Sequence, residues 1–505
     1  MTPARATVLG SLVALGLLPV VVVLGLQGED REPLRPLLHF TPARNFMNDP
    51  NGLVYLDGEY HLFYQHNPFG DRWGHMSWGH ATSRDLLRWE HLPVALYEED
   101  GVMVFSGSAV VDEENTSGLC EGAAPRSCLV AIWTGHSERD GRDHQTQNLA
   151  YSRDRGRTWT KYAGNPVVDL GRGDNRDPKV FWHEPTKRWV MATVLAGERK
   201  VRFFASADLK SWETLSDFGP AGATGGAWEC PDLFPLPVDG DPGATRWVLQ
   251  VDLNPGGPVG GSGAQYFVGS FDGRTFANDS PPEQTLWVDH GKDFYAAQSY
   301  SNLPPSPPRV VWIGWMSSWA YANDEPTSPW RGVQSLPREL SLRRTPDGIR
   351  LAQAPVRELA ARRASAEPLL VSAARELPGT AVIELEVVPG EWTEAGFRIA
   401  NGAGEETIVG VKAQPLEVFV DRRRSRAAPF HDEYPGRHAG PVRWREGRVE
   451  VGVVFDRTTL EVFANDGETV ISDRVYPTRP FDRLEPLDRS RGLAGPLRLF
   501  ALTDR

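Results

Sequence analysis

The sequence predicts an all-β protein: a five-bladed β-propeller followed by a C-terminal β-sandwich domain. Two observations predict this fold class. A strand–turn–aromatic unit recurs along the first part of the chain, and the last part alternates apolar and polar residues without that unit. With 505 residues the chain exceeds what one hydrophobic core usually supports, which agrees with two domains.

The recurring unit is a strand that ends in Ser-x-Asp and is followed within a few residues by an aromatic side chain. Its four copies begin at serines spaced by 54 to 69 residues, namely Ser83, Ser152, Ser206 and Ser270. That spacing suits one four-stranded sheet with its loops, and such recurrence is typical of a propeller. A fifth unit is expected over 294–319. The alternative is an irregular β-sandwich whose turns share Ser, Asp and Trp.

Short strands joined by tight turns fill these units. The runs 53–56 and 60–64 flank Asp57-Gly58, a dipeptide that favours the two-residue turn of a β-hairpin. The runs 179–182 and 189–193 flank a second polar turn. Both pairs predict antiparallel strands inside a blade.

Tryptophan becomes rare after Leu342, and 355–363 is expected to form a short polar helix that joins two bodies. The runs 381–387 and 449–455 then alternate apolar and polar residues, as half-buried antiparallel strands do. A series of such strands separated by Gly, Asp and Asn turns predicts a sandwich. This part of the chain shows no catalytic constellation.

These patterns divide the chain into four segments. The expected segments are an export signal or anchor over 1–36, a catalytic propeller over 37–345, a linker over 346–364 and a β-sandwich domain over 365–505.

The first segment contains an uncharged apolar run over 6–26, between Arg5 and an acidic cluster. The run is about as long as the ~20 residues that cross a bilayer, and no small-residue cleavage site follows it. A cleaved signal peptide and an uncleaved membrane anchor therefore both remain open. Either one predicts an extracellular protein, secreted or attached to the outer face of the cell membrane.

Composition narrows the class of partner. The formal net charge is −12, and Lys and Arg are scattered rather than gathered in a stripe, which argues against a nucleic-acid partner and suits a neutral substrate.

Of the three cysteines, Cys120 and Cys128 close a short loop that a disulfide could bridge, and Cys230 is left over. No metal-binding motif is visible, so no metal or cofactor is expected. Oligomeric state stays open.

Three carboxylates held at turns carry the chemical prediction. Asp49 lies in the turn 48–52 before a proline, Asp177 lies between Arg176 and Pro178, and Glu229 lies among aromatic and apolar residues. Glycosidic bonds are commonly cleaved by two carboxyl groups, one that donates a proton to the leaving oxygen and one that attacks the sugar.

The settings of the three residues suggest different roles. The proline after Asp49 fixes the backbone, which suits a nucleophile. The apolar setting of Glu229 suits a proton donor. The guanidinium of Arg176 should keep Asp177 ionised, so that it can accept hydrogen bonds from sugar hydroxyls.

Each motif also has a purely structural interpretation. Asp49 could cap its own backbone in an Asx turn, Asp177 could form a structural ion pair, and Glu229 could be an exposed loop residue. A triad or cysteine nucleophile could be assembled from Ser106, His75 or Cys230, but neither a G-x-S-x-G turn nor a papain-like cysteine context is present.

Beyond these arguments, the chain resembles glycoside hydrolase family 32, the group of invertases, levanases and exo-inulinases. The resemblance covers nearly the whole exported part and extends into the second domain. The motifs that carry it lie at 45–52, 105–108, 176–178, 229–231, 293–296, 314–319, 335–340 and 461–465.

The resemblance implies a retaining mechanism on β-fructofuranosides, with Asp49 as nucleophile, Glu229 as acid/base and Asp177 as transition-state stabiliser. Retention requires the carboxyl groups of Asp49 and Glu229 to lie about 5 to 5.5 Å apart. By position, the residues that match the fructose pocket of the family are Asn48, Gln65, Trp73, Phe105, Ser106, Arg176, Tyr295 and Trp319.

The runs 315–323 and 326–331 are similar to levanases and exo-inulinases more than to intracellular sucrases. The expected function is therefore an exo-acting fructan hydrolase that releases fructose from levan or inulin and also cuts sucrose. Two alternatives stay open: a fructosyltransferase, which shares the covalent intermediate, and a non-catalytic fructan-binding surface protein.

Overall fold

The computed structural model describes residues 32–124, 127–306, 308–364, 367–487 and 492–502. The predicted export segment at 6–26 lies outside these residues. Within them, no helix is both long and apolar enough to cross a membrane. Residues 34–505 form one compact unit.

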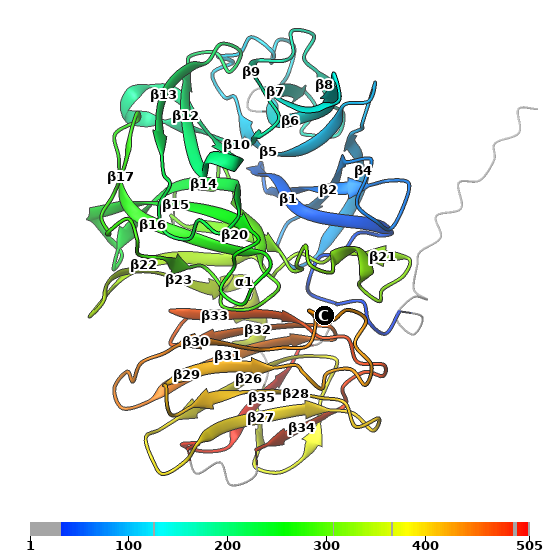
Figure 1. Cartoon of the computed structure of the whole chain (residues 1–505), viewed down its shortest axis with the longest axis vertical. Coiled ribbons are helices and arrows are strands. Elements are labelled where there is room, and N and C mark those ends of the chain that lie inside the picture. The colour runs from blue at the N-terminus through cyan, green and yellow to red at the C-terminus, as the bar shows by residue number, and fades with distance from the viewer. Residues whose placement is uncertain (1–31, 125–126, 307, 365–366, 488–491, 503–505) are drawn as a thin grey trace, which may run out of the picture. The chain divides into compact units, whose positions relative to one another are not determined.

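The first part of this unit is a propeller of five blades, confirming the predicted fold class (Figure 1). The pairing of Val238 with Leu342 joins the fourth and fifth blades into one nine-stranded sheet. The first blade contains β1 (Asn45–Leu56), β2 (Glu59–Asn67), β3 (Ser77–Ser83) and β4 (Trp89–Leu96), with β21 (Trp330–Arg331) parallel to β1. The second contains β5 (Met103–Val111), β6 (Leu129–Arg139), β7 (Arg142–Ser152), β8 (Thr160–Lys161) and β9 (Val168–Arg172).

The third blade contains β10 (Asn175–His183), β11 (Arg188–Leu195), β12 (Lys200–Ser206) and β13 (Glu213–Phe218). The fourth contains β14 (Ala227–Val238), β15 (Asp241–Asn254), β16 (Gly263–Phe271), β17 (Phe276–Asn278) and β18 (Leu286–Trp287). Short 3-10 helices span Glu184–Thr186, Ala196–Glu198 and Ala322–Asp324.

The fifth blade contains β19 (Tyr295–Ser299), β20 (Val310–Trp315), β22 (Arg338–Thr345) and β23 (Gly348–Pro355). β23 pairs with β22 along its whole length, from Arg338↔Pro355 to Thr345↔Gly348. The fifth sheet therefore runs to Pro355, into the segment 346–364 that was expected to be linker. A two-residue turn, Pro346-Asp347, reverses the chain between β22 and β23; this dipeptide is a turn signal that the sequence analysis did not use.

The Ser-x-Asp turns lie at equivalent places in four blades, at the end of the third strand or one residue before it. In each turn the aspartate Oδ1 accepts a backbone N–H from two to four residues later, at 2.8 to 3.0 Å. These are Asx-type turns, in which the side chain takes the place of a backbone acceptor. The aspartates are Asp85, Asp154, Asp208 and Asp272.

Apolar clusters fill the spaces between successive blades. Separate clusters lie between the first and second, second and third, third and fourth, and fourth and fifth blades. Another joins the first and fifth blades to the second domain. The disulfide Cys120–Cys128 closes a loop beside the second of these clusters.

The helix α1 (Arg357–Ala364) leads to two six-stranded antiparallel sheets that form the predicted sandwich. One sheet contains β24 (Leu369–Val371), β35 (Leu497–Ala501), β26 (Thr380–Val387), β31 (Val449–Asp456), β32 (Thr459–Ala464) and β33 (Thr469–Arg474). The other contains β25 (Arg375–Glu376), β34 (Arg483–Pro486), β27 (Glu394–Ala400), β28 (Glu406–Lys412), β29 (Glu417–Asp421) and β30 (Arg437–Pro441).

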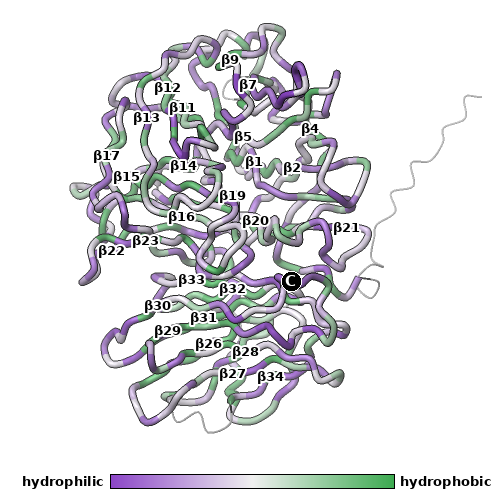
Figure 2. Tube along the Cα trace, viewed as in Figure 1, coloured by the Kyte–Doolittle hydropathy of each residue, from purple (hydrophilic) through white to green (hydrophobic). Residues whose placement is uncertain are grey.

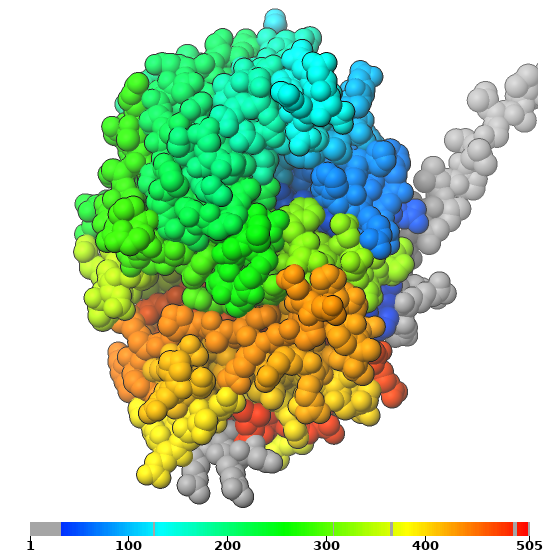
Figure 3. Space-filling model, viewed as in Figure 1, coloured from blue at the N-terminus to red at the C-terminus, as the bar shows by residue number. Residues whose placement is uncertain are grey.

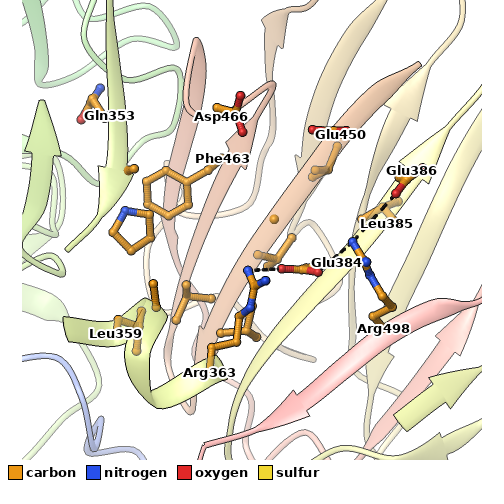
Figure 4. Close-up of a pocket in the computed structure, with 18 of the residues that line it drawn as sticks. Gln353, Leu359, Arg363, Glu384, Leu385, Glu386, Glu450, Phe463, Asp466 and Arg498 are labelled. Carbon is orange, nitrogen blue, oxygen red and sulfur yellow. Dashed lines mark ion pairs between the residues drawn. The ribbon is translucent and has the colours of Figure 1, made fainter. Parts of the chain in front are cut away.

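The inward faces of both sheets form one apolar core, and Figure 2 shows the hydrophobic stretches along β26 and β31. A groove separates α1 and β23 from the first of the two sheets. Across it Arg363 of α1 pairs with Glu384, and within the sheet Arg498 pairs with Glu384 and Glu386 (Figure 4). None of the three predicted catalytic carboxylates lines this groove.

Candidate active site

The innermost strand of every blade carries one extra residue at the same place. β1, β5, β10, β14 and β19 each pair with the next strand, and in each pair two residues oppose one residue of the partner. Such β-bulges re-aim side chains and are frequent beside active sites. The doubled positions are Asn48-Asp49, Phe105-Ser106, Asp177-Pro178, Cys230-Pro231 and Ala296-Ala297.

The five inner strands contact one another in sequence and close a ring, so the bulges meet around the propeller axis. Three of them place a non-glycine residue in the left-handed region, with φ of 61° at Asp177, 46° at Cys230 and 54° at Ala296. Such residues cost of order 1–3 kcal/mol and persist where surrounding structure holds them. In Figure 3, dark-blue atoms from the beginning of the described chain are visible in a recess between cyan and green atoms.

Asp49 is buried and held by three neighbours. Its Oδ2 accepts the Ser106 hydroxyl at 2.6 Å and lies 3.5 Å from the Cys230 Sγ, and its Oδ1 accepts the Asn48 amide at 3.0 Å. Burial raises the pKa of Asp49 to about 6, and the charge of Glu229 also raises it, while these hydrogen bonds lower it. The carboxylate is thus fixed in direction by groups that favour its ionised form.

Asp177 lies on the other side of Cys230. Its Oδ2 accepts the backbone N–H of Cys230 at 3.0 Å and lies 3.7 Å from Nε of Arg176. The sequence predicted that Arg176 would keep this carboxyl ionised. Arg176 does lower the pKa of Asp177, but burial is the larger effect and, with the charges of Glu229 and Asp49, raises it to about 7.

Glu229 meets a partner that its sequence neighbourhood does not contain. Its Oε1 accepts Nη2 and Nε of Arg176, at 2.9 and 3.2 Å, and its Oε2 accepts the hydroxyl of Tyr295. Arg176 comes from β10 and Tyr295 from β19, so two other blades orient this carboxylate. Arg176 contacts both Glu229 and Asp177.

Cys230 is the point where the three carboxylates converge. Its Sγ lies 3.5 Å from Asp49 and 3.7 Å from Asp177, its N–H binds Asp177, and Glu229 precedes it in the chain. Burial raises the pKa of this thiol well above its usual value, and the adjacent carboxylates raise it further, so it stays a neutral donor. Three carboxylates far apart in sequence therefore lie around one side chain.

Aromatic side chains surround this cluster. Phe105, Tyr295 and Trp319 belong to one apolar cluster with Cys230, and Trp73 packs edge-on against Phe105 with ring centroids 6.1 Å apart. The Trp73 indole is 41% exposed, which leaves it at the rim. Of the remaining predicted residues, Gln65 lies opposite the Asp49 bulge and binds the Val104 carbonyl at 2.9 Å.

The site contains a fourth carboxyl that the sequence interpretation missed. Asp252 on β15 is directly opposite Glu229 in strand register and is fully buried. Neither its oxygens nor the side-chain amide atoms of Gln250 have a hydrogen-bond partner of normal geometry within the described residues. Burial raises the pKa of Asp252 well above its usual value. The available signal was an aspartate inside the apolar strand 247–253.

Replacing Asp177 with asparagine is expected to stabilise the protein at pH 8. The folded-state pKa of Asp177 is raised, so keeping this group ionised costs stability above about pH 7, and the cost disappears as pH falls towards the unfolded-state value near 4. The Tm advantage of the variant should therefore be largest at pH 8 and vanish near pH 4. A Tm advantage that grows on acidification would contradict this account of the buried carboxyl.

Two family models match the chain: the glycosyl hydrolases family 32 N-terminal domain over residues 39–355 and the family 32 C-terminal domain over 356–491. The chain is 49% identical to the levanase of Bacillus subtilis over 468 residues, which cover 90% of this chain and 68% of the levanase.

It is 40% identical over 491 residues to the extracellular exo-inulinase of Aspergillus ficuum, covering 88% of this chain and 90% of that protein. The crystal structure of the exo-inulinase from Aspergillus awamori superposes with a TM-score of 0.86 at 35% identity, covering 94% of this chain and 99% of that one. These similarities span both domains.

Proposed function

The chain belongs to glycoside hydrolase family 32, and from that premise we propose that it is an exo-acting β-fructofuranosidase. It hydrolyses fructans, levan or inulin, and releases fructose from chain ends. The observation that carries this proposal is the convergence of Asp49, Asp177 and Glu229 around Cys230. Sucrose presents the same β-fructofuranosyl unit on a different leaving group and is expected to be cut as well.

In the first step, a carboxylate oxygen of Asp49 bonds to the anomeric carbon of the terminal fructosyl unit. The bond from that carbon to the glycosidic oxygen breaks, and Glu229 gives its proton to the departing oxygen. Before attack, hydrogen bonds from the Ser106 hydroxyl and the Asn48 side-chain amide favour the ionised form of Asp49.

In the second step, Glu229, now a carboxylate, takes a proton from water. The water oxygen bonds to the anomeric carbon and the ester to Asp49 breaks, which releases fructose with its original configuration. Arg176 donates to one carboxyl oxygen of Glu229 and Tyr295 donates to the other, so both oxygens are held in place.

Asp177 binds the hydroxyls of the fructosyl ring rather than the reacting atom. Its carboxylate can accept two hydroxyl hydrogen bonds, and these strengthen as positive charge develops on the sugar. Trp73, Phe105 and Trp319 supply apolar surface for the sugar faces, and Gln65 and Asn48 line the inner wall.

The N-terminal run at 6–26 and the extracellular exo-inulinase relative support an extracellular location. A polymer too large to import must be trimmed outside the cell. We further propose that this run either is a cleaved signal or attaches the enzyme to the outer face of the cell membrane. We also propose that the boundary between the propeller and the sandwich lies within 356–368.

Incubating the purified enzyme separately with levan, inulin and sucrose tests the function. Fructose is expected as the product from the earliest time points, with no fructan fragments of intermediate length. Early intermediate fragments would contradict exo action. At high sucrose concentration, predominance of longer oligosaccharides over free fructose would identify a fructosyltransferase instead, and absence of any turnover would identify a binding protein.

Activity should fall on the acid side because the reacting form of Asp49 is ionised. With the pKa of Asp49 at about 6 and that of Asp177 at about 7, kcat/KM is expected to decline as pH drops through this range. The pair titrates jointly, so the profile reports both groups.

Ser106→Ala is expected to move the acid side of this pH profile to higher pH by about one to two units, because a hydrogen bond to an ionised group is worth about 1.5–3 kcal/mol. Its matched control is Ser108→Ala on the same strand, since the Ser108 hydroxyl binds the Pro178 carbonyl and no carboxylate. An acid side that stays in place in Ser106→Ala, or shifts equally in Ser108→Ala, would contradict the assigned role of Ser106.

A further inference from the structure

A buried polar cluster joins the sandwich domain to the wall of the active site. Its members are Asp293 before β19, Tyr321 in the loop after β20, and Arg422 after β29 of the sandwich. All three are at most 1% exposed. We name this set the Arg422 cluster.

The hydrogen bonds of this cluster form a closed triangle. The Tyr321 hydroxyl donates to Oδ1 of Asp293, Nη1 of Arg422 donates to Oδ2 of Asp293, and Nη2 of Arg422 donates to the Tyr321 oxygen at 2.8 Å. The sandwich strengthens the triangle with a backbone donor, since Arg474 N–H binds Oδ2 of Asp293 at 2.7 Å. The remaining Arg422 donors bind the backbone carbonyls of Tyr434 and Arg474.

Each propeller member of the cluster is two residues from a residue of the active site. Asp293 precedes Tyr295, whose hydroxyl binds Glu229, and Tyr321 follows Trp319, which packs in the same apolar cluster as Tyr295. Between Asp293 and Tyr295, Phe294 lies under the guanidinium of Arg338 at 4.3 Å. Asp293 and Phe294, the two residues before Tyr295, are therefore both held by contacts with buried arginine side chains.

The position that follows Tyr295 explains why holding these two residues matters. Ala296 has a φ of 54° and begins the bulge of β19, a conformation that surrounding structure must hold. A buried charged pair is a weak source of stability, because desolvation offsets the attraction, but its fixed geometry can specify one arrangement. Burial lowers the pKa of Arg422, but Asp293 and neighbouring groups together raise it well above the usual value, so the guanidinium stays charged.

We propose that Arg422 is a positioning residue for catalysis: through Asp293 and Tyr321, the sandwich domain sets Tyr295 and Trp319, and Tyr295 in turn aims Glu229. The sandwich is thus part of the catalytic machinery rather than an appended module. This proposal rests on the proposed role of Glu229 as the group that protonates the leaving oxygen.

The test compares two tyrosine-to-phenylalanine variants that each remove one buried hydroxyl. Tyr321→Phe breaks the triangle and keeps the ring. Tyr434→Phe is the matched control, since Tyr434 is equally buried against Arg422. Among the described residues, the hydroxyl of Tyr434 binds Ser425 and the Tyr476 N–H, both in the sandwich, and no propeller residue. Both variants should lose a similar few degrees of Tm.

Only Tyr321→Phe is expected to lose activity: kcat for sucrose should fall about tenfold with KM nearly unchanged, while Tyr434→Phe stays within about twofold of the parent. Equal kcat losses in the two variants, or a folded Tyr321→Phe with parental kcat, would overturn the proposal. Arg422→Lys keeps the positive charge but loses the planar guanidinium that donates to Asp293 and Tyr321 at once. It should reproduce the kcat loss.

A second substrate separates this proposal from the proposed function itself. Fluoride leaves β-fructofuranosyl fluoride without a proton, so kcat/KM for this substrate should be unchanged in Tyr321→Phe while kcat/KM for sucrose falls. An equal fall for both substrates would show that the cluster does not act through Glu229. Failure of the parent enzyme to release fructose from either substrate would instead refute the proposed function.

Discussion

Replacing Asp49 with alanine is expected to lower kcat for sucrose by roughly 10⁴-fold or more, because the step that forms the fructosyl ester loses its nucleophile. The variant should fold, since it removes a buried carboxyl whose pKa burial raises and leaves the Ser106 hydroxyl free to bind water. Initial rates on sucrose, with Tm as the check on folding, measure the effect.

Adding azide to the Asp49→Ala variant makes this test specific for the nucleophile. In Asp49→Ala a small anion can enter the space left by the carboxylate and attack the anomeric carbon from the same side, giving fructosyl azide of inverted configuration. Appearance of that product identifies Asp49 as the group that normally occupies the position. Retention of more than a few per cent of parental activity without azide would exclude Asp49 as the nucleophile.

Glu229→Gln is expected to abolish proton donation while leaving sugar binding largely intact. General acid–base catalysis contributes typically 10²–10⁴-fold, so kcat for sucrose should fall within that range. The amide keeps the shape of the side chain and can still meet Arg176 and Tyr295. Fructose release from sucrose and binding of fructose by calorimetry measure the two effects separately.

Gln65→Leu provides a contrast for this variant, because Gln65 lies opposite the Asp49 bulge and its amide donates to the Val104 carbonyl rather than to a carboxylate. It should weaken sugar binding and raise KM more than it lowers kcat. Unchanged fructose release in Glu229→Gln would rule out the acid/base assignment.

The sequence was sufficient for the fold class because the signals of a propeller are local. Asp85, Asp154, Asp208 and Asp272 each cap a turn within their own blade, so a short stretch of sequence contains both donor and acceptor. The strand before Asp57-Gly58 and the alternating strands of the second domain are local in the same sense.

The three carboxylates proposed for catalysis could be named from the sequence, but their partners could not. Arg176 stands beside Asp177 in sequence, whereas its shorter contact is with Glu229, 53 residues further along the chain. Burial also outweighs Arg176 in setting the pKa of Asp177, and burial is a property of the ring of five strands rather than of any single motif.

Contacts between paired strands and between domains were the least visible. Asp252 becomes a neighbour of Glu229 only through the pairing of β14 and β15, and Arg422 reaches Asp293 only when the sandwich folds against the fifth blade. The equivalent bulges in the five inner strands follow from pairing register, which a single strand does not contain.

Hydrolysis of sucrose in aqueous methanol tests the central claim most directly. Methanol competes with water for the fructosyl ester on Asp49 and yields a methyl fructofuranoside whose anomeric configuration is fixed and can be assigned by NMR. Two displacements at the same carbon predict the β anomer. Formation of the α anomer would mean a single displacement, with no covalent bond to Asp49, and would contradict the account.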